Sequence, residues 1–405
     1  MSPPPIAHSP DLALLRDEGF TVRIAGGHLV IDDIPYVDSE GTVHDDGALV
    51  MALNLAGDRT TRPGDHTAYW VGLVPCTITG AQLDNIINNT NPADLGDGIM
   101  ASAYFSAKPT AGAYTDYHHK VITYVGHIAG PAVAIDSSAT PRRFRPVEAD
   151  DTDATPFRYL DTASSRAGID SVNERLSDER VGIIGVGGTG AYVLDLVAKT
   201  RAPEIHLFDA DVFLTHNAFR SPGAPTLEQL NERPTKVDHL AAQYSNMHSR
   251  VIPHPVRVDD TNVEQLRGLS FAFVAIDDAA AKAPIIAALR HHDIPFIDVG
   301  MGVDVVDGQL RGLIRSTLVT PDRHDHLERR IPTIDAGAEG EYRSNIQIAE
   351  LNMLNAAHAV IMWKKFRHVY ADTDHPHSVM FNVATNGVAN DECDEVIDVR
   401  EEDAA

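Results

Sequence analysis

Four closely spaced glycines in the second half of the chain have the pattern of a phosphate-binding loop. They lie in the stretch GVGGTG, after the apolar run 181–184 and before a helix predicted over 191–199. Glycine lets the backbone turn sharply and approach a phosphate, and a helix N-terminus directs free N–H groups at negative charge. The predicted nucleotide-binding glycines are Gly185, Gly187, Gly188 and Gly190.

Asp209 lies nineteen residues after Gly190, at the end of the next apolar run, 205–208. A carboxylate at this place can accept hydrogen bonds from the ribose of a bound nucleotide. Taken alone, the loop and this aspartate fit any dinucleotide-binding domain, for which a nicotinamide oxidoreductase is the default interpretation.

The polar residues that follow narrow the chemistry. Asn217 and Arg220 lie in DADVFLTHNAFR, Lys236 in RPTKVDHL and Asp277 in FVAIDD. In this order behind GxGGxG, they resemble the ThiF and MoeB branch of the ubiquitin-activating-enzyme family, over about residues 158–367. The resemblance implies an enzyme that binds ATP, lets a protein carboxylate attack the α-phosphate, and releases pyrophosphate.

The residue types suit that reaction. Attack at the α-phosphate spreads negative charge over its oxygens, so catalysis depends on positioning and electrostatic stabilisation. Arg220 and Lys236 would supply positive charge, and Asn217 would orient a phosphate oxygen. Asp277 would hold the Mg²⁺ that bridges the phosphates, with Asp278 as the alternative ligand. No general base is needed, because a C-terminal carboxylate is already ionised at neutral pH.

The resemblance also implies a homodimer with shared sites. In the family, an arginine before the first strand reaches the phosphates bound by the partner protomer. Arg166, in SSRAGI, is the best match to that catalytic arginine, and Arg158 is the alternative.

Each of these residues also has an ordinary structural explanation. An aspartate after a strand often caps the next helix, and a single arginine or lysine is often a surface charge. The order of all of them behind the glycine loop is what favours a site.

The cysteines depart from the family pattern. The chain has only Cys76 and Cys393, and neither belongs to a CxxC pair of the kind that binds structural zinc in relatives. Relatives that form a thioester carry a cysteine where this chain reads RSTLVTPDRHDHLERR. We therefore expect either direct transfer of an acyl-adenylate or an oxyester on Thr317 or Thr320. The histidines of the same stretch predict a solvated polar loop rather than a metal site.

The first part of the chain carries a second resemblance. The stretches HTAYWVGLVPCTITGAQLDNIIN, YFSAKP and KVITYVGHIAGPA resemble a domain of unknown function found ahead of ThiF domains. In bacteria such proteins tend to be encoded beside ubiquitin-like proteins and companions resembling conjugating or deconjugating enzymes. This favours a ubiquitin-like protein as the substrate and a conjugating-enzyme-like protein as a further partner.

Composition excludes some partners. The formal net charge of −25 repels phosphate backbones and anionic lipid, so we expect neither nucleic acid nor a membrane as a partner. No apolar run approaches the roughly 18 residues of a membrane span, and no export signal is evident, which predicts a cytoplasmic protein.

The hydrophobic pattern predicts an α/β fold: a doubly wound, Rossmann-like and mainly parallel sheet, preceded by a smaller α+β domain. The first domain has strands predicted at 20–24, 28–31, 67–73 and 120–128 and a helix at 82–88. In the second, strands are predicted at 181–184, 205–208, 271–276 and 295–299, with a hairpin at Asp307-Gly308 and a long helix starting at a capping box, Ser344 with Gln347.

We expect five segments along the chain: a disordered N-terminus at 1–10, an N-terminal α+β accessory domain at 11–146, a linker at 147–156, a ThiF-type adenylation domain at 157–390 and an acidic tail at 391–405.

The leading hypothesis is therefore ATP- and Mg²⁺-dependent adenylation of the C-terminus of a ubiquitin-like protein. The alternatives are activation of another carboxylate, as in a peptide or a sulfur-carrier protein, and a nucleotide-binding adaptor without catalysis. A nicotinamide oxidoreductase explains the glycine loop and Asp209 but leaves Asn217, Arg220 and Lys236 without a role.

Overall fold

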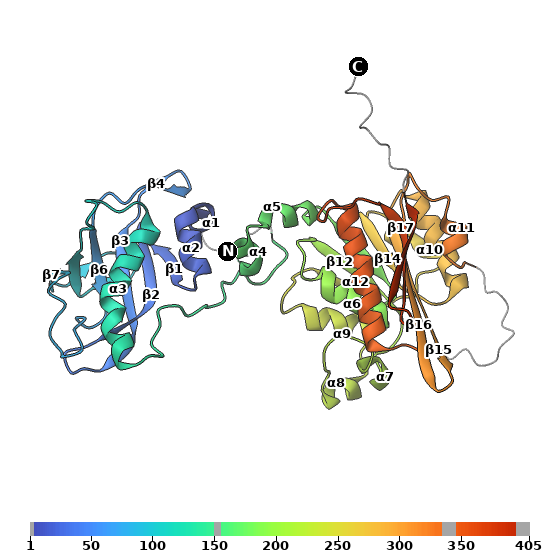
Figure 1. Cartoon of the computed structure of the whole chain (residues 1–405), viewed down its shortest axis with the longest axis horizontal. Helices are drawn as coiled ribbons and strands as arrows, with labels where there is room; N and C mark the ends of the chain where they lie inside the picture. Colours follow the sequence, from blue (N-terminus) through green and yellow to red (C-terminus); the bar gives the residue numbers. More distant parts are fainter. Residues whose placement is uncertain (1–3, 150–154, 334–345, 394–405) are drawn as a thin grey trace, which may run out of the picture. The chain divides into compact units, whose positions relative to one another are not determined.

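The computed structural model describes residues 4–149, 155–333 and 346–393. The chain forms two compact units (Figure 1): Met1–Asp153 with Tyr159–Gly168, and Ala154–Arg158 with Ile169–Ala405. Tyr159–Gly168, which falls inside the predicted adenylation domain, thus clusters with the first unit. The domain boundaries drawn from the sequence stay a prediction. Among the described residues, no helix has both the length and the apolar character needed to cross a membrane.

The first unit is built on a six-stranded antiparallel sheet in the order β1-β2-β3-β6-β10-β7. Helix α3 packs against β2 and β3, and its buried face joins the core of this unit. The elements are α1 (Pro4–His8), α2 (Pro10–Asp17), β1 (Thr21–Ala25), β2 (His28–Val37), β3 (Val43–Ala52), β4 (Leu55–Ala56), β5 (Arg59–Thr60), β6 (Thr67–Val71), β7 (Ile87–Asn89), β8 (Ala93–Asp94), β9 (Met100–Ala101), β10 (Ala103–Ser106), α3 (Tyr117–Ile135) and α4 (Thr162–Ala167).

Two elements predicted for this unit are wrong. The stretch 120–128 is part of helix α3 rather than a strand, and the predicted helix at 82–88 is replaced by turns and by β7. In α3 the buried residues Val121, Tyr124 and Val125 recur at helical spacing, and Asp116 caps the helix by accepting from the backbone N–H of His119. Tertiary packing of this face outweighs the β-propensity of its valines and isoleucines.

The start of the chain also differs from the sequence-based expectation. Helix α1 occupies Pro4–His8, inside the segment 1–10 for which disorder is predicted, and Ile6 is buried in the core of the first unit.

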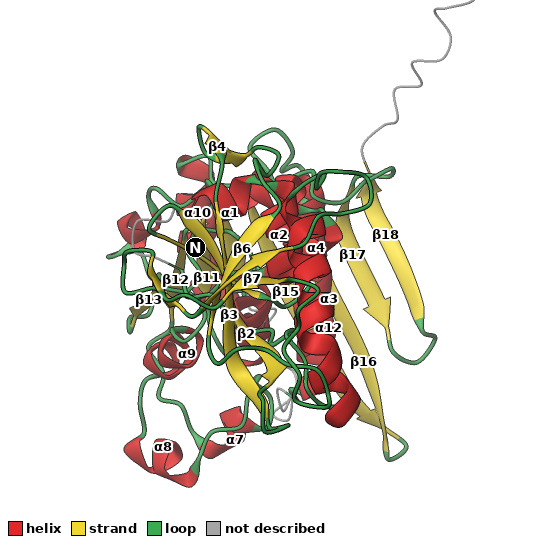
Figure 2. Ribbon diagram, turned by 90° about the vertical axis from the view of Figure 1, so that its left-hand side faces the viewer, coloured by secondary structure: helices red, strands yellow, loops and turns green. Residues whose placement is uncertain are grey.

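The second unit has an eight-stranded mixed sheet in the order β13-β12-β11-β14-β15-β16-β17-β18. The first five are parallel, and β16, β17 and β18 continue the sheet as antiparallel strands that end at one edge (Figure 2). The fold class predicted from the sequence is confirmed. The elements are α5 (Asp170–Asn173), a 3₁₀ turn (Glu174–Leu176), β11 (Arg180–Ile184), α6 (Gly188–Val197), β12 (Glu204–Phe208), α7 (Thr215–Ala218), α8 (Leu227–Glu232), α9 (Lys236–Tyr244), β13 (Val251–His254), a 3₁₀ turn (Val263–Leu266), β14 (Phe271–Val274), α10 (Ala279–His291), β15 (Phe296–Val306), β16 (Gln309–Val319), α11 (Leu327–Arg330), α12 (Ala349–Phe366), β17 (Pro376–Asn382) and β18 (Gly387–Cys393).

Helices cover the parallel part of the sheet on both faces. The second unit has a separate cluster of buried side chains on each face of this sheet. Helices α6, α9 and α12 contribute to one cluster, and α10 contributes to the other. The sequence explains the strands: the four residues of β14 are all buried, as expected for a strand covered on both sides. The hairpin prediction is confirmed, because Asp307 and Gly308 have φ of 52° and 77° between β15 and β16.

Helix α12 begins later than the sequence predicts. Its first residue is Ala349, preceded by Ile348 in an extended conformation without a side-chain cap. Ser344 lies outside the described residues, and Gln347 lines a cavity instead of completing a capping box. Strand β18 likewise reaches Cys393, inside the predicted acidic tail.

The close packing of α12 on α6 positions the glycine loop (Figure 1). Asn352 on α12 is fully buried, accepts a hydrogen bond from Thr189 Oγ1 at 2.9 Å, and donates to the carbonyl of Arg220 at 3.4 Å. A Cβ at Gly188 would lie 2.0 Å from Asn352 Nδ2, so only glycine permits this approach.

We predict that Gly188→Ala lowers the free energy of unfolding by about 1–3 kcal/mol, because the added methyl group must displace the buried amide of Asn352. Gly302→Ala is the matched control, since a Cβ there meets no atom within 4 Å. Urea denaturation of both variants measures the difference. Equal stabilities would contradict the packing described for α6 and α12.

In the first unit we predict that Gly126→Ala raises the free energy of unfolding by about 0.5–1 kcal/mol, because alanine is favoured in a helix and a Cβ meets open space there. Gly47→Ala should instead be destabilising by about 1–3 kcal/mol, because its Cβ would lie 2.3 Å from the indole of Trp70. Thermal unfolding of the two variants checks the opposite signs; stabilisation by Gly47→Ala would contradict the packing.

Candidate active site

A cavity of about 420 Å³ lies at the carboxyl ends of β11, β12 and β14 and beside β15. This is where open α/β sheets bind their ligands. Five basic and four acidic side chains line it, although the whole chain carries a net charge of −25. The cavity is therefore electrostatically unlike the rest of the chain. Its charged lining residues are Asp209, Asp211, Arg220, Lys236, Arg257, Asp277, Asp278, Lys282 and Arg315.

The predicted glycine loop forms one wall of the cavity. Gly185, Gly187 and Gly188 line it, and α6 begins at Gly188, so the N–H groups of its first turn have no partner within the helix. Gly185 has φ of 85°, and a Cβ there would lie 2.6 Å from the carbonyl of Ala275. Gly190 does not line the cavity, because it packs against the loop itself. A Cβ added at Gly190 would lie 1.9 Å from the carbonyl oxygen of Gly185. The loop thus offers a compact set of N–H donors.

Asp209 fixes the shape of this loop. One carboxylate oxygen accepts from the backbone N–H of Val186 at 3.0 Å, and the other accepts from the N–H of Asp211 at 2.9 Å. The side chain also lines the cavity and is 10% exposed. Asp209 therefore supports the loop in addition to facing any ligand.

Lys236 opens helix α9 and points its ammonium group into the same region. Its Nζ lies 2.6 Å from Asp211 and 3.5 Å from Asp209, and only 9% of its side chain is exposed. The side chain of Asp211 is 72% exposed, so its ion pair with Lys236 contributes little free energy. When an anion binds Lys236, water can replace the lysine as the partner of the Asp211 carboxylate at small cost.

Asn217 and Arg220 lie on and just after the short helix α7. Asn217 is buried and accepts from the backbone N–H of Leu214 through Oδ1, while Arg220 lines the cavity. Two of their donor atoms, Asn217 Nδ2 and Arg220 Nε, are buried without a hydrogen-bond partner. Gln347 Oε1, in the cavity wall, is a buried acceptor in the same condition.

The carboxylates after β14 have different surroundings. Asp278 caps α10 by accepting from the backbone N–H of Ala281, and its other oxygen lies 2.7 Å from Arg257. The hydrogen bond from Ala281, together with Arg257, lowers the pKa of the Asp278 carboxyl. Asp277 lines the cavity directly after the strand. Both aspartates line the cavity, so the assignment of the metal ion to Asp277, with Asp278 as the alternative, stays a prediction.

The predicted arginines before the first strand lie elsewhere. Arg166 belongs to α4 in the first unit, where its guanidinium lies 5.9 Å from the centre of the Phe144 ring. Arg158 donates to the carbonyl of Ser245. Neither lines the cavity of its own chain.

Several polar cavity residues were not predicted from the sequence, among them Arg257, Lys282, Arg315 and Asn355. Asn355 donates to the Gly300 carbonyl at 3.0 Å and so joins α12 to β15. Lys282 is a buried residue in the first part of α10. Arg315 carried no signal in the sequence, since its position depends on the register of β15 and β16.

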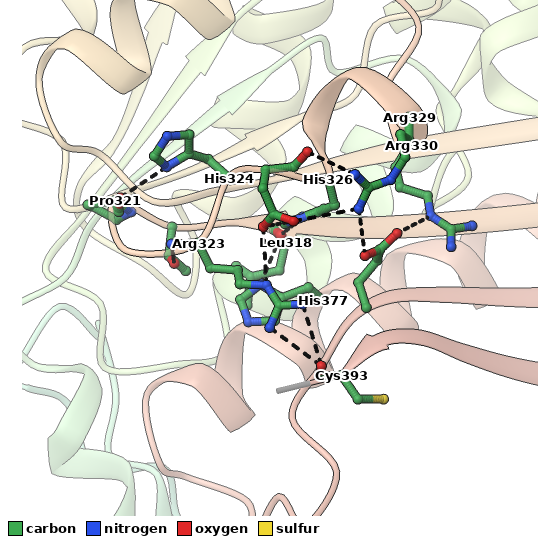
Figure 3. Close-up of polar contacts among 12 residues, drawn as sticks. Leu318, Pro321, Arg323, His324, His326, Arg329, Arg330, His377 and Cys393 are labelled. Carbon is green, nitrogen blue, oxygen red and sulfur yellow. Dashed lines mark hydrogen bonds and ion pairs between the residues drawn. The ribbon is translucent and has the colours of Figure 1, made fainter. Parts of the chain in front are cut away.

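The stretch from Thr317 to His326 is only partly exposed (Figure 3). His324 is exposed, as expected for a solvated loop, whereas His326 is fully buried and donates to the Leu318 carbonyl at 2.8 Å. Thr317 is fully buried and accepts from Arg315, and Thr320 is 9% exposed. This burial argues against an oxyester on either hydroxyl.

The two cysteines lie in different settings. Cys76 is buried. Cys393 is exposed, its carbonyl accepts from Arg323, and its thiol points away from the labelled histidines (Figure 3). Within the described ranges, no group of three or more histidine, cysteine or acidic side chains could hold a metal ion by itself.

These features fit a nucleotide with a magnesium ion. An unpaired buried polar atom costs about 1–3 kcal/mol, and a phosphate oxygen would satisfy Arg220 Nε, whose residue lines the cavity. Asn217 Nδ2 is also buried without a partner, but Asn217 is not among the lining residues. A magnesium ion is commonly held by one or two carboxylates together with substrate phosphates, so Asp277 alone can suffice.

Comparison with known proteins agrees with this geometry. A model of the ThiF family matches residues 162–352, and a model of a domain of unknown function, DUF6791, matches residues 10–162. Ubiquitin-like modifier-activating enzyme 5 of Drosophila virilis is 23% identical over 184 residues, 42% of this chain and 45% of that protein. The tRNA threonylcarbamoyladenosine dehydratase of Escherichia coli K12 is 27% identical over 133 residues, 31% of this chain and 47% of that protein. The chain thus spans about half the length of these curated relatives.

Among solved structures, PaaA has a TM-score of 0.43 at 18% identity, covering 55% of this chain and 75% of its own. Escherichia coli MccB with ATP has a TM-score of 0.43 at 17% identity, covering 54% and 65%. The order of the glycine loop, Asp209, Arg220, Lys236 and Asp277 around one cavity agrees with the family match. Residues 162–352 of this chain are a ThiF family domain, homologous to the ubiquitin-activating enzymes.

Proposed function

We propose that the cavity binds ATP with Mg²⁺ and adenylates a carboxylate. The strongest support is a buried donor without a partner, Arg220 Nε, on a residue that lines the same cavity as the first residues of α6. Matched ThiF and ubiquitin-activating relatives are ATP-dependent enzymes, which supports ATP over a nicotinamide cofactor.

The reaction requires little covalent chemistry from the protein. A carboxylate oxygen forms a bond to the α-phosphorus, the bond from that phosphorus to the bridging oxygen of the β-phosphate breaks, and pyrophosphate leaves with the electron pair. Arg220 and Lys236 offset the negative charge that gathers on the phosphate oxygens, and the first N–H groups of α6 orient them.

Asp277 would hold the magnesium ion, which neutralises charge on the triphosphate when it is bound. Asp209 would keep the loop in place through Val186 while facing the ribose. Asn217 would donate through its free Nδ2 to a phosphate oxygen without adding charge.

The proposed substrate is the C-terminus of a ubiquitin-like protein. The match to ubiquitin-like modifier-activating enzyme 5 and the resemblance of the first unit to domains encoded beside ubiquitin-like proteins support this choice. The match to a tRNA-modifying dehydratase favours a second candidate, a carboxylate on tRNA. The net charge of −25 disfavours it, because a tRNA backbone would be repelled.

The assembly remains part of the proposal. We propose the homodimer that the family resemblance implies, in which Arg166 reaches the phosphates bound by the partner protomer. A conjugating-enzyme-like protein would take the activated acyl group, since Cys76, Thr317 and Thr320 are buried and the exposed Cys393 is not among the residues that line the cavity.

ATP–pyrophosphate exchange tests this function. With magnesium and a ubiquitin-like protein as the substrate, we expect exchange that requires that protein's free C-terminus. Asp277→Asn should lower the exchange rate roughly 100-fold or more, because the metal loses its protein ligand. Asp304→Asn, an equally conservative change at an exposed position of β15, should leave the rate unchanged.

Two results would count against the proposal. ATP binding without any exchange would indicate a nucleotide-binding adaptor without catalysis. Tight binding of a nicotinamide cofactor in place of ATP would indicate an oxidoreductase.

A further inference from the structure

The cavity contains a second charged group that the proposed nucleotide site does not use. Lys282 of α10 lies 2.6 Å from one oxygen of Asp298 on β15, and Arg315 of β16 lies 2.5 Å from the other. The side chains of this Asp298 triad are 4%, 0% and 15% exposed for Lys282, Asp298 and Arg315. Lys282 and Arg315 both line the cavity, so the triad forms part of its wall.

The guanidinium of Arg315 is held in one orientation. Its Nη1 donates to Thr317 Oγ1 at 2.6 Å, and its Nη2 donates to Asp298. Gly300, the cross-strand neighbour of Arg315, makes this possible, since a Cβ there would lie 2.8 Å from Nη2. Asn355 Nδ2 donates a hydrogen bond to the carbonyl of the same glycine, Gly300. A planar guanidinium fixed in this way is ready to bind a planar anion without further loss of side-chain entropy.

The triad carries a surplus of positive charge. Two cations share one carboxylate, and all three groups are almost fully removed from water. A buried charge without a counterion is costly, whereas an ion pair that serves only the fold would be neutral. An anion that enters from the cavity would balance the group.

The position of the triad separates it from the phosphate site. The glycine loop follows β11, and β14 lies between β11 and β15 in the sheet. Neighbouring strands are about 4.7–4.9 Å apart, so β15 lies roughly 10 Å from β11. Adenylation brings two anions together in one cavity, a triphosphate and a carboxylate. With the triphosphate at the N-terminus of α6, the triad is left for the carboxylate.

We propose that Arg315, held over Gly300 by Asp298 and Thr317 and supported by Lys282, binds the carboxylate that becomes adenylated. This inference rests on the proposed function and adds a substrate-binding residue to it. The guanidinium would bind the carboxylate through charge-assisted hydrogen bonds and reduce its repulsion from the triphosphate. One carboxylate oxygen stays in place to attack the α-phosphorus.

A small peptide acid tests the assignment directly. The probe is N-acetylglycylglycine, with its C-terminal amide as the uncharged counterpart, titrated by ligand-observed NMR into the full chain with magnesium and α,β-methylene-ATP. Wild-type protein should prefer the acid over the amide by roughly tenfold or more, as expected for hydrogen bonds to a charged group.

Three variants locate the preference. Arg315→Gln should abolish it while the Kd for α,β-methylene-ATP, measured by calorimetry, stays within about twofold of wild type. Arg315→Lys keeps the charge but loses the second hydrogen bond, so it should retain part of the preference. Arg311→Gln removes the same charge from an exposed position on the same strand and should behave as wild type. If Arg315→Gln does not fold, Arg315→Lys serves for the comparison.

Several outcomes overturn the inference. The first is an equal affinity of the wild-type protein for the acid and the amide. The second is a full preference for the acid in Arg315→Gln. The third is a roughly tenfold loss of nucleotide affinity in the Arg315 variants, which would assign the triad to the triphosphate. Failure of wild-type protein to bind the nucleotide would be a different result, because it would refute the proposed function itself.

Discussion

The arrangement of the second unit depends on how tightly the glycine loop is held between β11 and α6. Asp209 accepts from the loop backbone at Val186, and Asn352 on α12 packs directly on Gly188 and bonds to Thr189. Together they hold the loop and the first turn of α6, which line the cavity. Asn352 also reaches the carbonyl of Arg220, so the same side chain ties a phosphate-facing segment to the loop.

Electrostatics then divides the cavity into two regions. Near the loop, Lys236 is balanced by one buried and one exposed carboxylate, which leaves it available to an anion. Across the sheet, the buried Asp298 pairs with two cations that line the same cavity. A strongly acidic chain thus has five basic side chains around the cavity where the two proposed anionic reactants would meet, and the exposed carboxylates of its surface do not offset charges that are buried.

Sequence patterns predict the parts of this fold that depend on local chemistry. The glycine loop, the short apolar strands and the Asp307-Gly308 turn each need particular residues at particular positions, and the structure has them there. The sequence pattern predicts a strand where helix α3 lies, because valine and isoleucine suit a strand, whereas packing against β2 and β3 selects a helix. Arg315 had no local signal, because its contact with Asp298 exists only through the pairing of β15 with β16. The burial of Asn217, which leaves one donor free, could likewise be seen only in three dimensions.

A crystal structure with α,β-methylene-ATP and magnesium would test the nucleotide site most directly. We expect the α-phosphate at the N-terminus of α6, within hydrogen-bonding distance of Arg220, with the ribose at Asp209 and the metal ion on Asp277. A nucleotide bound outside this cavity, or one whose phosphates point away from Arg220 and Lys236, would contradict this expectation.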